Sequence, residues 1–232
     1  MQYLGSKNKL SKELLEVFKD YLKEGHTYYE PFVGGANMID KIKGHKRIGS
    51  DYNSFLIAMW KALQNGWQPP ENISKEEYKQ IRANISKFDK ELVCFVGYLC
   101  SFGGKWFGGY ASNSKGDNYC ARGKRVLLKQ IENLKDVKFI WSDYKDLELE
   151  PNSFIYCDPP YENTTKYKDE FDHKEFWQWV RDKTKDGHTI LVSEYNAPND
   201  FKCIWEKKVK TVLNKNNQND FRLERLFKYT IK

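Results

Sequence analysis

The stretch "SFIYCDPPY", Ser153 to Tyr161, decides the fold because it joins a β-strand to a corner that can continue neither a strand nor a helix. Its first five residues form a short, mostly apolar run of the length typical of a buried strand. Asp158 and two prolines follow, and proline lacks the backbone N–H group that a sheet or a helix needs. The predicted strand therefore ends at Asp158 and presents a carboxylate at its carboxyl end.

Strand and helix patterns alternate on both sides of this stretch, which predicts an α/β fold with a parallel sheet and helices packed on it. The end of the chain favours two antiparallel strands at the sheet edge. Predicted helices of the alternating part cover residues 10–23, 36–43, 54–66 and 173–187. Predicted strands cover residues 27–30, 47–51, 137–143, 153–158, 188–193, 203–216 and 221–230.

Residues 67–135 interrupt the alternation and are predicted to form a mostly helical insertion. Within them, the stretch "GGKWFGGYASNSKGDNYC" (residues 103–120) is rich in glycine, aromatic and polar residues and shows no clear period. Long loops in compact domains are usually functional or disordered. We therefore expect one catalytic domain, formed by residues 1–66 and 136–232, and one insertion, formed by residues 67–135.

The composition limits the classes of partner and cofactor. The formal net charge of +7, from 39 Lys and Arg against 32 Asp and Glu, permits a nucleic-acid partner without demanding one. The five cysteines form no C-x-x-C pair and have no histidine at ligand spacing, so we expect no metal site and a reducing, cytoplasmic environment. No signal peptide or run of about 20 apolar residues is present, so we expect no membrane association.

Four predicted strands each bring an acidic residue to their carboxyl ends, where open α/β sheets bind ligands. These residues are Glu30, Asp51, Asp143 and Asp158. The sequence therefore predicts one crevice lined by carboxylates rather than four separate sites.

The turn "EPFVGGAN" (residues 30–37) suits a nucleoside ligand. Glycines after a strand let a ligand approach the backbone, and a following helix N-terminus favours electron-rich groups, although an ordinary tight turn is the alternative. Asp51 lies near the offset of about 20 residues at which an acid binds a ribose, and capping of the next helix is a compatible role. A third glycine and a phosphate-binding Lys-Ser/Thr pair are missing. These features favour a nucleoside without a pyrophosphate, and S-adenosylmethionine is the foremost such ligand.

The corner after Cys157 presents hydrogen-bond acceptors. Pro159 offers a carbonyl oxygen, the prolines remove two backbone donors, and Asp158 adds carboxylate oxygens. This set matches an amino group with two hydrogens, and Tyr161 adds a flat ring for stacking. We interpret the corner as a device that holds an –NH₂ group against an electrophile; the alternative is a strand end with a solvated acid.

In combination these motifs resemble the Dam-type DNA adenine methylases, and in particular their phage-type members. The residues from Tyr156 to Tyr161 look like the D-P-P-Y motif of amino-methyltransferases, and the residues from Glu30 to Gly35 look like their first motif. "YLGSK" (residues 3–7) is similar to the motif that precedes it in this group, and the order of the motifs agrees along nearly the whole chain. Ala36 departs from the family, which usually has glycine there.

The resemblance implies a Rossmann-like methyltransferase sheet with helices on both faces and a target-recognition insertion. It implies transfer of a methyl group from S-adenosylmethionine to the N6 amino group of adenine in duplex DNA, at a specific site and after base flipping. The catalytic residues that it implies are Asp158, Pro159, Pro160 and Tyr161. The cofactor-binding residues that it implies are Tyr3, Gly5, Lys7, Glu30, Phe32, Gly34, Gly35, Asp51, Asp143, Tyr144 and Asp158.

The insertion carries side chains suited to double-stranded DNA, since lysine and arginine bind phosphates while asparagine and aromatic rings reach or wedge bases. A surface loop with solvated charges is the alternative. The candidate DNA-binding residues are Lys105, Trp106, Tyr110, Asn113, Lys115, Arg122, Lys124 and Arg125. We further expect Ser193, Glu194 and Tyr195 to shape the base pocket. A cognate restriction nuclease is a candidate partner, and a monomer is expected, with a dimer as the alternative.

Other acceptors fit the same corner. Cytosine N4, RNA or a protein glutamine would each offer a similar amino group, and a DNA-binding relative without catalysis is a further alternative. In the amino-methyltransferases that this chain resembles, the position of Asp158 is more often serine in cytosine enzymes and more often asparagine in glutamine and RNA enzymes. The intact corner from Asp158 to Tyr161, together with Asp51, argues against an inactive relative.

Overall fold

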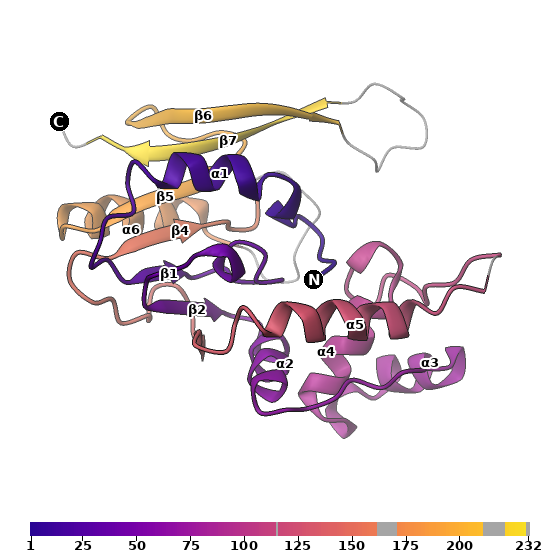
Figure 1. The fold of residues 1–232 in the computed structure, drawn as a ribbon. Coiled ribbons are helices and arrows are strands. Elements are labelled where there is room, and N and C mark those ends of the chain that lie inside the picture. The colour runs from indigo at the N-terminus through magenta and orange to yellow at the C-terminus, as the bar shows by residue number, and fades with distance from the viewer. Residues whose placement is uncertain (115, 162–170, 211–220, 231–232) are drawn as a thin grey trace.

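The computed structural model describes residues 1–114, 116–161, 171–210 and 221–230, and its centre is a seven-stranded sheet of order β3-β2-β1-β4-β5-β7-β6 (Figure 1). The first five strands in this order are parallel, and β7 pairs antiparallel with both β5 and β6. The strands are β1 (Tyr28–Glu30), β2 (Arg47–Asp51), β3 (Lys138–Trp141), β4 (Phe154–Cys157), β5 (Thr189–Glu194), β6 (Phe201–Lys210) and β7 (Phe221–Tyr229).

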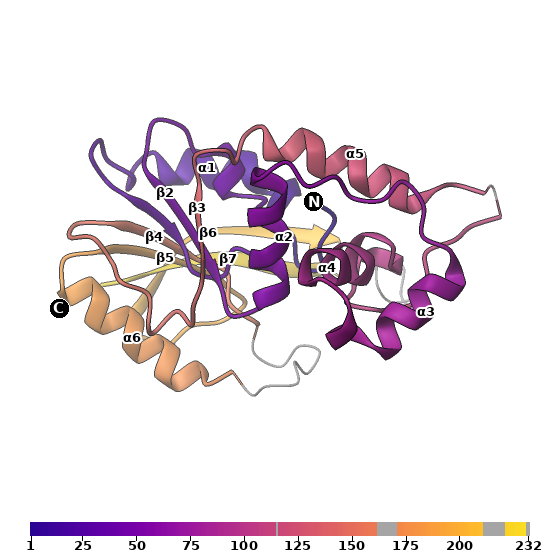
Figure 2. The same ribbon diagram turned by 90° about the horizontal axis from the view of Figure 1, so that it is seen from below.

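Helices cover both faces of the sheet, as Figure 2 shows. Helices α1 (Ser11–Phe18) and α2 (Ser54–Gln64) contribute to one apolar cluster, and α6 (His173–Lys185) belongs to a second cluster on the opposite face. This arrangement confirms the predicted Rossmann-like α/β fold with helices on both faces. Three further helices lie beyond α2: α3 (Lys75–Ala83), α4 (Lys90–Leu99) and α5 (Tyr119–Ile131).

The helix predicted for residues 36–43 is wrong, because only a 3₁₀ turn forms there, at Ile39–Lys41. Tertiary contacts outweigh the helical pattern in this segment. The carbonyl of Ile39 accepts a hydrogen bond of 2.8 Å from the buried Arg47 side chain, and Ala36 adopts a left-handed φ of 51°. The glycine turn is therefore not followed by the helix N-terminus that the sequence predicted for it.

Other predicted helices and strands end at different residues in the structure. Helix α1 stops at Phe18 instead of residue 23, because Asp20 and Tyr21 make backbone hydrogen bonds to the third preceding residue, which is the tight geometry of a helix end. Strand β3 ends at Trp141, two residues before Asp143. The antiparallel pair β6–β7 is confirmed, while the part of its first predicted strand beyond Lys210 lies outside the described residues.

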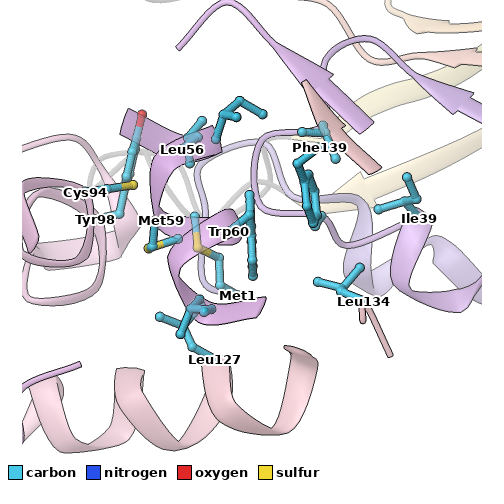
Figure 3. Close-up of a cluster of buried hydrophobic side chains, with 14 of the residues drawn as sticks. Met1, Ile39, Leu56, Met59, Trp60, Cys94, Tyr98, Leu127, Leu134 and Phe139 are labelled. Carbon is cyan, nitrogen blue, oxygen red and sulfur yellow. The ribbon is translucent and has the colours of Figure 1, made fainter. Parts of the chain in front are cut away.

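Residues 67–135 share their core with the sheet instead of forming a separate one. Helix α2 lies between the sheet on one side and helices α4 and α5 on the other (Figure 3). The ring of Trp60 stacks on Phe139 of β3 with centroids 5.9 Å apart. The close-up also shows Leu127 of α5 next to Met1, on the side of α2 away from Phe139. The division of the chain into a catalytic domain and an insertion stays a prediction.

The described helices include none with the length and apolar content that crossing a membrane requires.

Candidate active site

The corner after β4 contacts the N-terminal segment of the chain. Strand β4 ends at Cys157, so Asp158 is the first residue past the sheet. Its Oδ1 atom lies 2.8 Å from the ammonium nitrogen of Lys7. Lys7 is buried and opens a 3₁₀ turn, Lys7–Lys9, whose preceding residue Ser6 accepts a hydrogen bond from the Asn8 amide. The sequence predicted Lys7 as a cofactor contact, and the structure places its ammonium group on the carboxylate of the corner.

A second carboxylate joins this ion pair from strand β7. Oε2 of Glu224 lies 3.6 Å from Nζ of Lys7 and accepts a 3.0 Å hydrogen bond from the hydroxyl of Tyr161. The Lys7 ammonium also lies 4.6 Å from the ring centroid of Tyr161, which is cation–π distance. Sequence reasoning missed Glu224, since an acid between charged and apolar residues of an edge strand looks like part of a solvated face.

Burial governs the charges of this network. Burial by itself lowers the pKa of Lys7, but the carboxylates of Asp158 and Glu224 outweigh it and raise the pKa above its ordinary value. Burial raises the pKa of Asp158, although the Lys7 ammonium acts in the opposite direction. Burial also raises the pKa of Tyr161 well above its ordinary value. Lys7 therefore stays charged at neutral pH, and Tyr161 keeps its proton for the hydrogen bond to Glu224.

The glycine turn after β1 lies under the ring of Tyr3. Gly34 has a left-handed φ of 43°, and a Cβ atom there would lie 2.9 Å from Cε1 of Tyr3. A Cβ atom on Gly35 would lie 2.9 Å from Cβ of Tyr3 and 2.7 Å from Nδ2 of Asn37. Both glycines are thus needed for the close approach of the N-terminal segment, in addition to any approach of a ligand.

Two side chains from other elements hold this turn in place, and neither was predicted to do so from the sequence. Trp60 of α2 donates a 3.0 Å hydrogen bond to the carbonyl of Gly34. Gln130 of α5 donates to the carbonyls of Gly35 at 3.0 Å and Ala36 at 2.9 Å. The turn is thereby held by α2, which packs on the sheet, and by α5, which belongs to residues 67–135.

Asp51, at the end of β2, joins the glycine turn to helix α2. One carboxylate oxygen accepts a 2.9 Å hydrogen bond from the Gly34 amide, and the other accepts one of 2.9 Å from the Asn53 amide. Burial raises the pKa of Asp51 to about 6, although both amides favour the ionised form. Asn53, not Asp51, caps α2, since its side chain accepts from the Phe55 amide. Each carboxylate oxygen retains lone pairs for further donors.

The remaining predicted cofactor residues surround these groups with different degrees of exposure. Tyr144 is buried, and its ring lies 5.5 Å from that of the half-buried Phe32. Asp143 is half-buried and accepts a hydrogen bond from the Lys145 amide at 3.1 Å. Glu30 is buried, accepts a 3.2 Å hydrogen bond from Tyr28, and has a pKa raised well above its ordinary value by burial.

Residues Gly5, Pro159 and Pro160 complete the predicted set. The carbonyl of Gly5 accepts a 3.3 Å hydrogen bond from the Lys7 ammonium, and Gly5 has a left-handed φ of 80°. Pro159 is buried and Pro160 half-buried beside Asp158. The described atoms thus bring together two groups: the corner with Lys7 and Glu224, and the glycine turn with Tyr3 and Asp51.

Several residues predicted to bind DNA have contacts within the protein. Trp106 packs against Tyr98 with ring centroids 4.9 Å apart, and the Tyr110 hydroxyl donates to the Ile73 carbonyl at 2.8 Å. Lys124 pairs with Glu71 at 2.8 Å. Their DNA-binding roles stay predictions, with these contacts as competing structural roles.

The other predicted DNA-binding residues lie at the surface where the structure describes them. Asn113 donates to Asp117 at 2.6 Å. Lys105, Arg122 and Arg125 are exposed, and Lys115 lies outside the described residues. The described part of the chain also contains no group of three or more His, Cys, Asp or Glu side chains placed to hold a metal ion.

Strand β5 ends beside the corner, at the three residues predicted to shape a base pocket. The hydroxyl of Ser193 lies 2.8 Å from that of Tyr156. Glu194 is buried, and its carboxylate accepts a 2.7 Å hydrogen bond from the Tyr195 amide. The Tyr195 ring meets that of Tyr161 nearly at a right angle, with centroids 4.5 Å apart. A tyrosine pair thus forms one side of the corner.

The chain is similar in sequence to known DNA-modifying methyltransferases. The chain is 25% identical over 78% of its length to the type II methyltransferase M.FokI of Planomicrobium okeanokoites, and spans 31% of that protein. It is 27% identical over 72% of its length to the type II methyltransferase M.MjaIII of Methanocaldococcus jannaschii, and spans 70% of it. It is 27% identical over 64% of its length to a DNA adenine methylase of Vibrio cholerae, and spans 61% of that protein.

A family model matches most of the chain. It covers residues 3–93 and 105–221, and includes the N-terminal segment, the glycine turn and the Asp158 corner. The family is described as the D12 class of N6 adenine-specific DNA methyltransferases. This chain belongs to that family.

Proposed function

We propose that the chain is a site-specific DNA methyltransferase that modifies the N6 amino group of adenine. The observation that carries the proposal is the corner at Asp158, where a carboxylate and a proline carbonyl follow a strand end inside a chain of the adenine-specific family. An exocyclic amino group offers two hydrogens to these two acceptors. The chain spans less than two thirds of two of the three relatives named above, so their activities serve here as support for the proposal.

The residues around the glycine turn fit S-adenosylmethionine, which would supply a methyl group on a positively charged sulfur. Asp51 offers carboxylate lone pairs to ribose hydroxyls, and its pKa of about 6 leaves it ionised at neutral pH. Gly34 and Gly35 keep the turn free of side chains, and the half-buried ring of Phe32 offers an apolar face. Asp143 and Tyr144 would border the adenine of the cofactor.

In the proposed mechanism, Asp158 and the Pro159 carbonyl accept hydrogen bonds from the two N6 hydrogens of the target base. These bonds draw the nitrogen toward tetrahedral geometry and make its lone pair available for attack. Lys7 stabilises the ionised form of Asp158, since its ammonium lies 2.8 Å from the carboxylate. Tyr161 stacks on the base while Glu224 fixes its hydroxyl. Positioning and preorganised acceptors then supply most of the rate acceleration.

The target base must leave the duplex to reach this corner, at a cost of a few kcal/mol that pocket contacts offset. We assign target recognition to residues 67–135, and phosphate contacts to the exposed Lys105 and Arg122. The names of the relatives also support a type II restriction–modification role with a partner nuclease. The DNA of a bacterium or of its phage lies in the cytoplasm, which is where we place the activity.

Nucleoside analysis after methyl transfer tests the proposal. The protein is incubated with labelled S-adenosylmethionine and unmethylated DNA, RNA or a mixed protein extract, and the modified species is identified by mass spectrometry. The expected product is N6-methyladenine in DNA. Labelled N4-methylcytosine, or label confined to RNA or to glutamine, would refute adenine as the target. DNA binding without any transfer would identify an inactive relative.

A further inference from the structure

Arg222 of β7 lies at the rim of the tyrosine pair beside the Asp158 corner. Its Nη1 atom donates a 3.1 Å hydrogen bond to the hydroxyl of Tyr195, and its guanidinium carbon lies 5.7 Å from the centroid of that ring. The Tyr195 ring in turn contacts Tyr161. Arg222 precedes Glu224 by two positions, and residues two apart on a strand share a face of the sheet. One strand therefore supplies an inner carboxylate and an outer cation to the same site.

Among the described residues, the guanidinium group of Arg222 contacts the Tyr195 side chain but pairs with no carboxylate, in contrast to that of its neighbour Arg225. Arg225 pairs with Glu206 at 3.2 Å and donates to the Tyr195 carbonyl at 2.6 Å. No ion pair of Arg222 occurs within the part of the chain that the structure describes, and the residue is exposed. A cavity of about 230 Å³ adjoins both arginines and is lined by Tyr195, Asn196, Arg222, Leu223 and Arg225.

We infer that Arg222 and the Tyr195 hydroxyl bind a backbone phosphate next to the target adenine. This inference rests on the proposed function. A nucleotide that enters the corner with its base first leaves its phosphates at the rim, where the guanidinium group lies. The planar guanidinium donates two parallel hydrogen bonds to phosphate oxygens, and the tyrosine hydroxyl can donate a third.

The position of the hairpin β6–β7 agrees with a bound duplex. The end of the hairpin at Lys210 and Phe221 lies on the same side of the molecule as helices α3 to α5, as Figures 1 and 2 both show. Lys208 and Lys210 are exposed near this end. A duplex that contacts residues 67–135 would therefore extend toward the positively charged strand pair β6–β7.

The salt dependence of methyl transfer tests this subsite without knowledge of the recognition sequence. We would measure kcat/KM on unmethylated plasmid DNA between 50 and 200 mM KCl for the wild type and for Arg222→Gln. Loss of one phosphate contact reduces the slope against log salt by about 1. The drop in kcat/KM over this salt range should therefore become about threefold smaller in the variant.

Two control variants separate a phosphate subsite from other effects. Arg222→Lys keeps the charge and should retain the wild-type slope. Lys202→Gln removes one exposed charge at the opposite end of the hairpin, where Lys202 pairs with Lys228, and should also leave the slope unchanged. An unchanged slope in Arg222→Gln, or an equal change in Lys202→Gln, would overturn the subsite. A wild type that transfers no methyl group to DNA would instead overturn the proposed function and with it this inference.

Discussion

Tyr161 and Glu224, 63 positions apart in the chain, are joined by a 3.0 Å hydrogen bond from the tyrosine hydroxyl to Oε2 of the glutamate. The same oxygen lies 3.6 Å from the ammonium of Lys7, which binds Asp158. Strand β7 is thus connected to the corner after β4 through two polar contacts. The ring that would stack on the target base is held by a residue of strand β7, far from it in the sequence.

Replacement of Glu224 should therefore lower the rate of methyl transfer more than it lowers the affinity for DNA. Glu224→Gln keeps an acceptor for Tyr161 but removes the charge near Lys7, and we expect kcat to fall about tenfold. Glu224→Leu removes both contacts, and we expect a fall of about 100-fold, because a hydrogen bond to a charged group contributes about 1.5–3 kcal/mol. Steady-state kinetics on plasmid DNA measures both values.

The control for this prediction is Glu206→Gln on the neighbouring strand, where the exposed Glu206 pairs with Arg225. It should leave kcat within about twofold, as expected for a surface ion pair. Equal effects of Glu206→Gln and Glu224→Gln would show that the loss reflects the hairpin as a whole. A Glu224→Gln variant with normal kcat would exclude the positioning role.

The corner and the glycine turn could be predicted from the sequence, because their signals are local. Two prolines directly after Asp158 stop β4 at Cys157, and glycine permits the left-handed φ of Gly34. Glu224 could not be predicted in the same way. Its place in the site depends on the pairing of β7 with β5, in which Glu194 lies opposite Arg225, and no local pattern encodes this register.

The failed helix at residues 36–43 has a similar cause. The apolar spacing there is that of a helix, but Ile39, Ile42 and Met38 are buried against the sheet in an irregular segment. The Arg47 side chain takes the Ile39 carbonyl, which a helix would need for its own backbone. Contacts with residues distant in the sequence thus decide both the position of Glu224 in the site and the conformation of residues 36–43.

Removal of the Lys7 charge should destabilise the fold as well as the site. Lys7→Met leaves the carboxylates of Asp158 and Glu224 without their shared cation in a buried setting. We expect the free energy of unfolding to fall by about 3 kcal/mol, the scale for breaking a buried ion pair. Urea unfolding followed by circular dichroism measures this change.

Two variants check the origin of that loss. The double variant Lys7→Met/Glu224→Gln removes one of the stranded charges and should recover part of the stability. Lys9→Met alters an exposed lysine of the same 3₁₀ turn and should change the free energy of unfolding by less than about 0.5 kcal/mol. No recovery in the double variant would contradict an electrostatic origin.

The affinity for S-adenosylmethionine should depend on pH through Asp51. The pKa of this group in the free protein is about 6, and ribose hydroxyls bind the ionised carboxylate more strongly than the protonated acid. The affinity is therefore full above pH 6 and falls as the pH drops through 6, by about tenfold between pH 7 and pH 5. Isothermal titration calorimetry across this range measures the profile.

Asp51→Asn should bind the cofactor more weakly at pH 7 and show a flat profile over the same range. A wild-type affinity that is constant between pH 5 and pH 7 would mean that Asp51 does not contact the ribose. If the affinity of Asp51→Asn for S-adenosylmethionine fell with pH as it does in the wild type, another group would be responsible for the titration.

Gly34→Ala should weaken cofactor binding through the N-terminal segment. Alanine at a left-handed φ costs about 1–2 kcal/mol, and its Cβ atom would also displace the ring of Tyr3 from its position 2.9 Å away. Gly44→Ala is the matched control, since Gly44 has a φ of 76° and no heavy atom within 4 Å of an added Cβ. Both variants should lose stability.

Calorimetry with S-adenosylmethionine separates the two glycine variants. Only Gly34→Ala should lose affinity, by at least about tenfold, because only there does the added methyl group disturb the turn beside Asp51. Comparable affinity in both variants would indicate that the packing of Tyr3 on the turn has no part in cofactor binding.

The central claim is that the Asp158 carboxylate accepts from the N6 amino group of adenine as the methyl group is transferred. Its most direct test is single-turnover transfer by the wild type and Asp158→Asn, with both proteins saturated with S-adenosylmethionine and DNA and N6-methyladenine quantified by mass spectrometry. The account predicts N6-methyladenine from the wild type and a loss of about 10³-fold or more in Asp158→Asn, with DNA binding retained. A normal rate of N6-methyladenine formation by Asp158→Asn would contradict it.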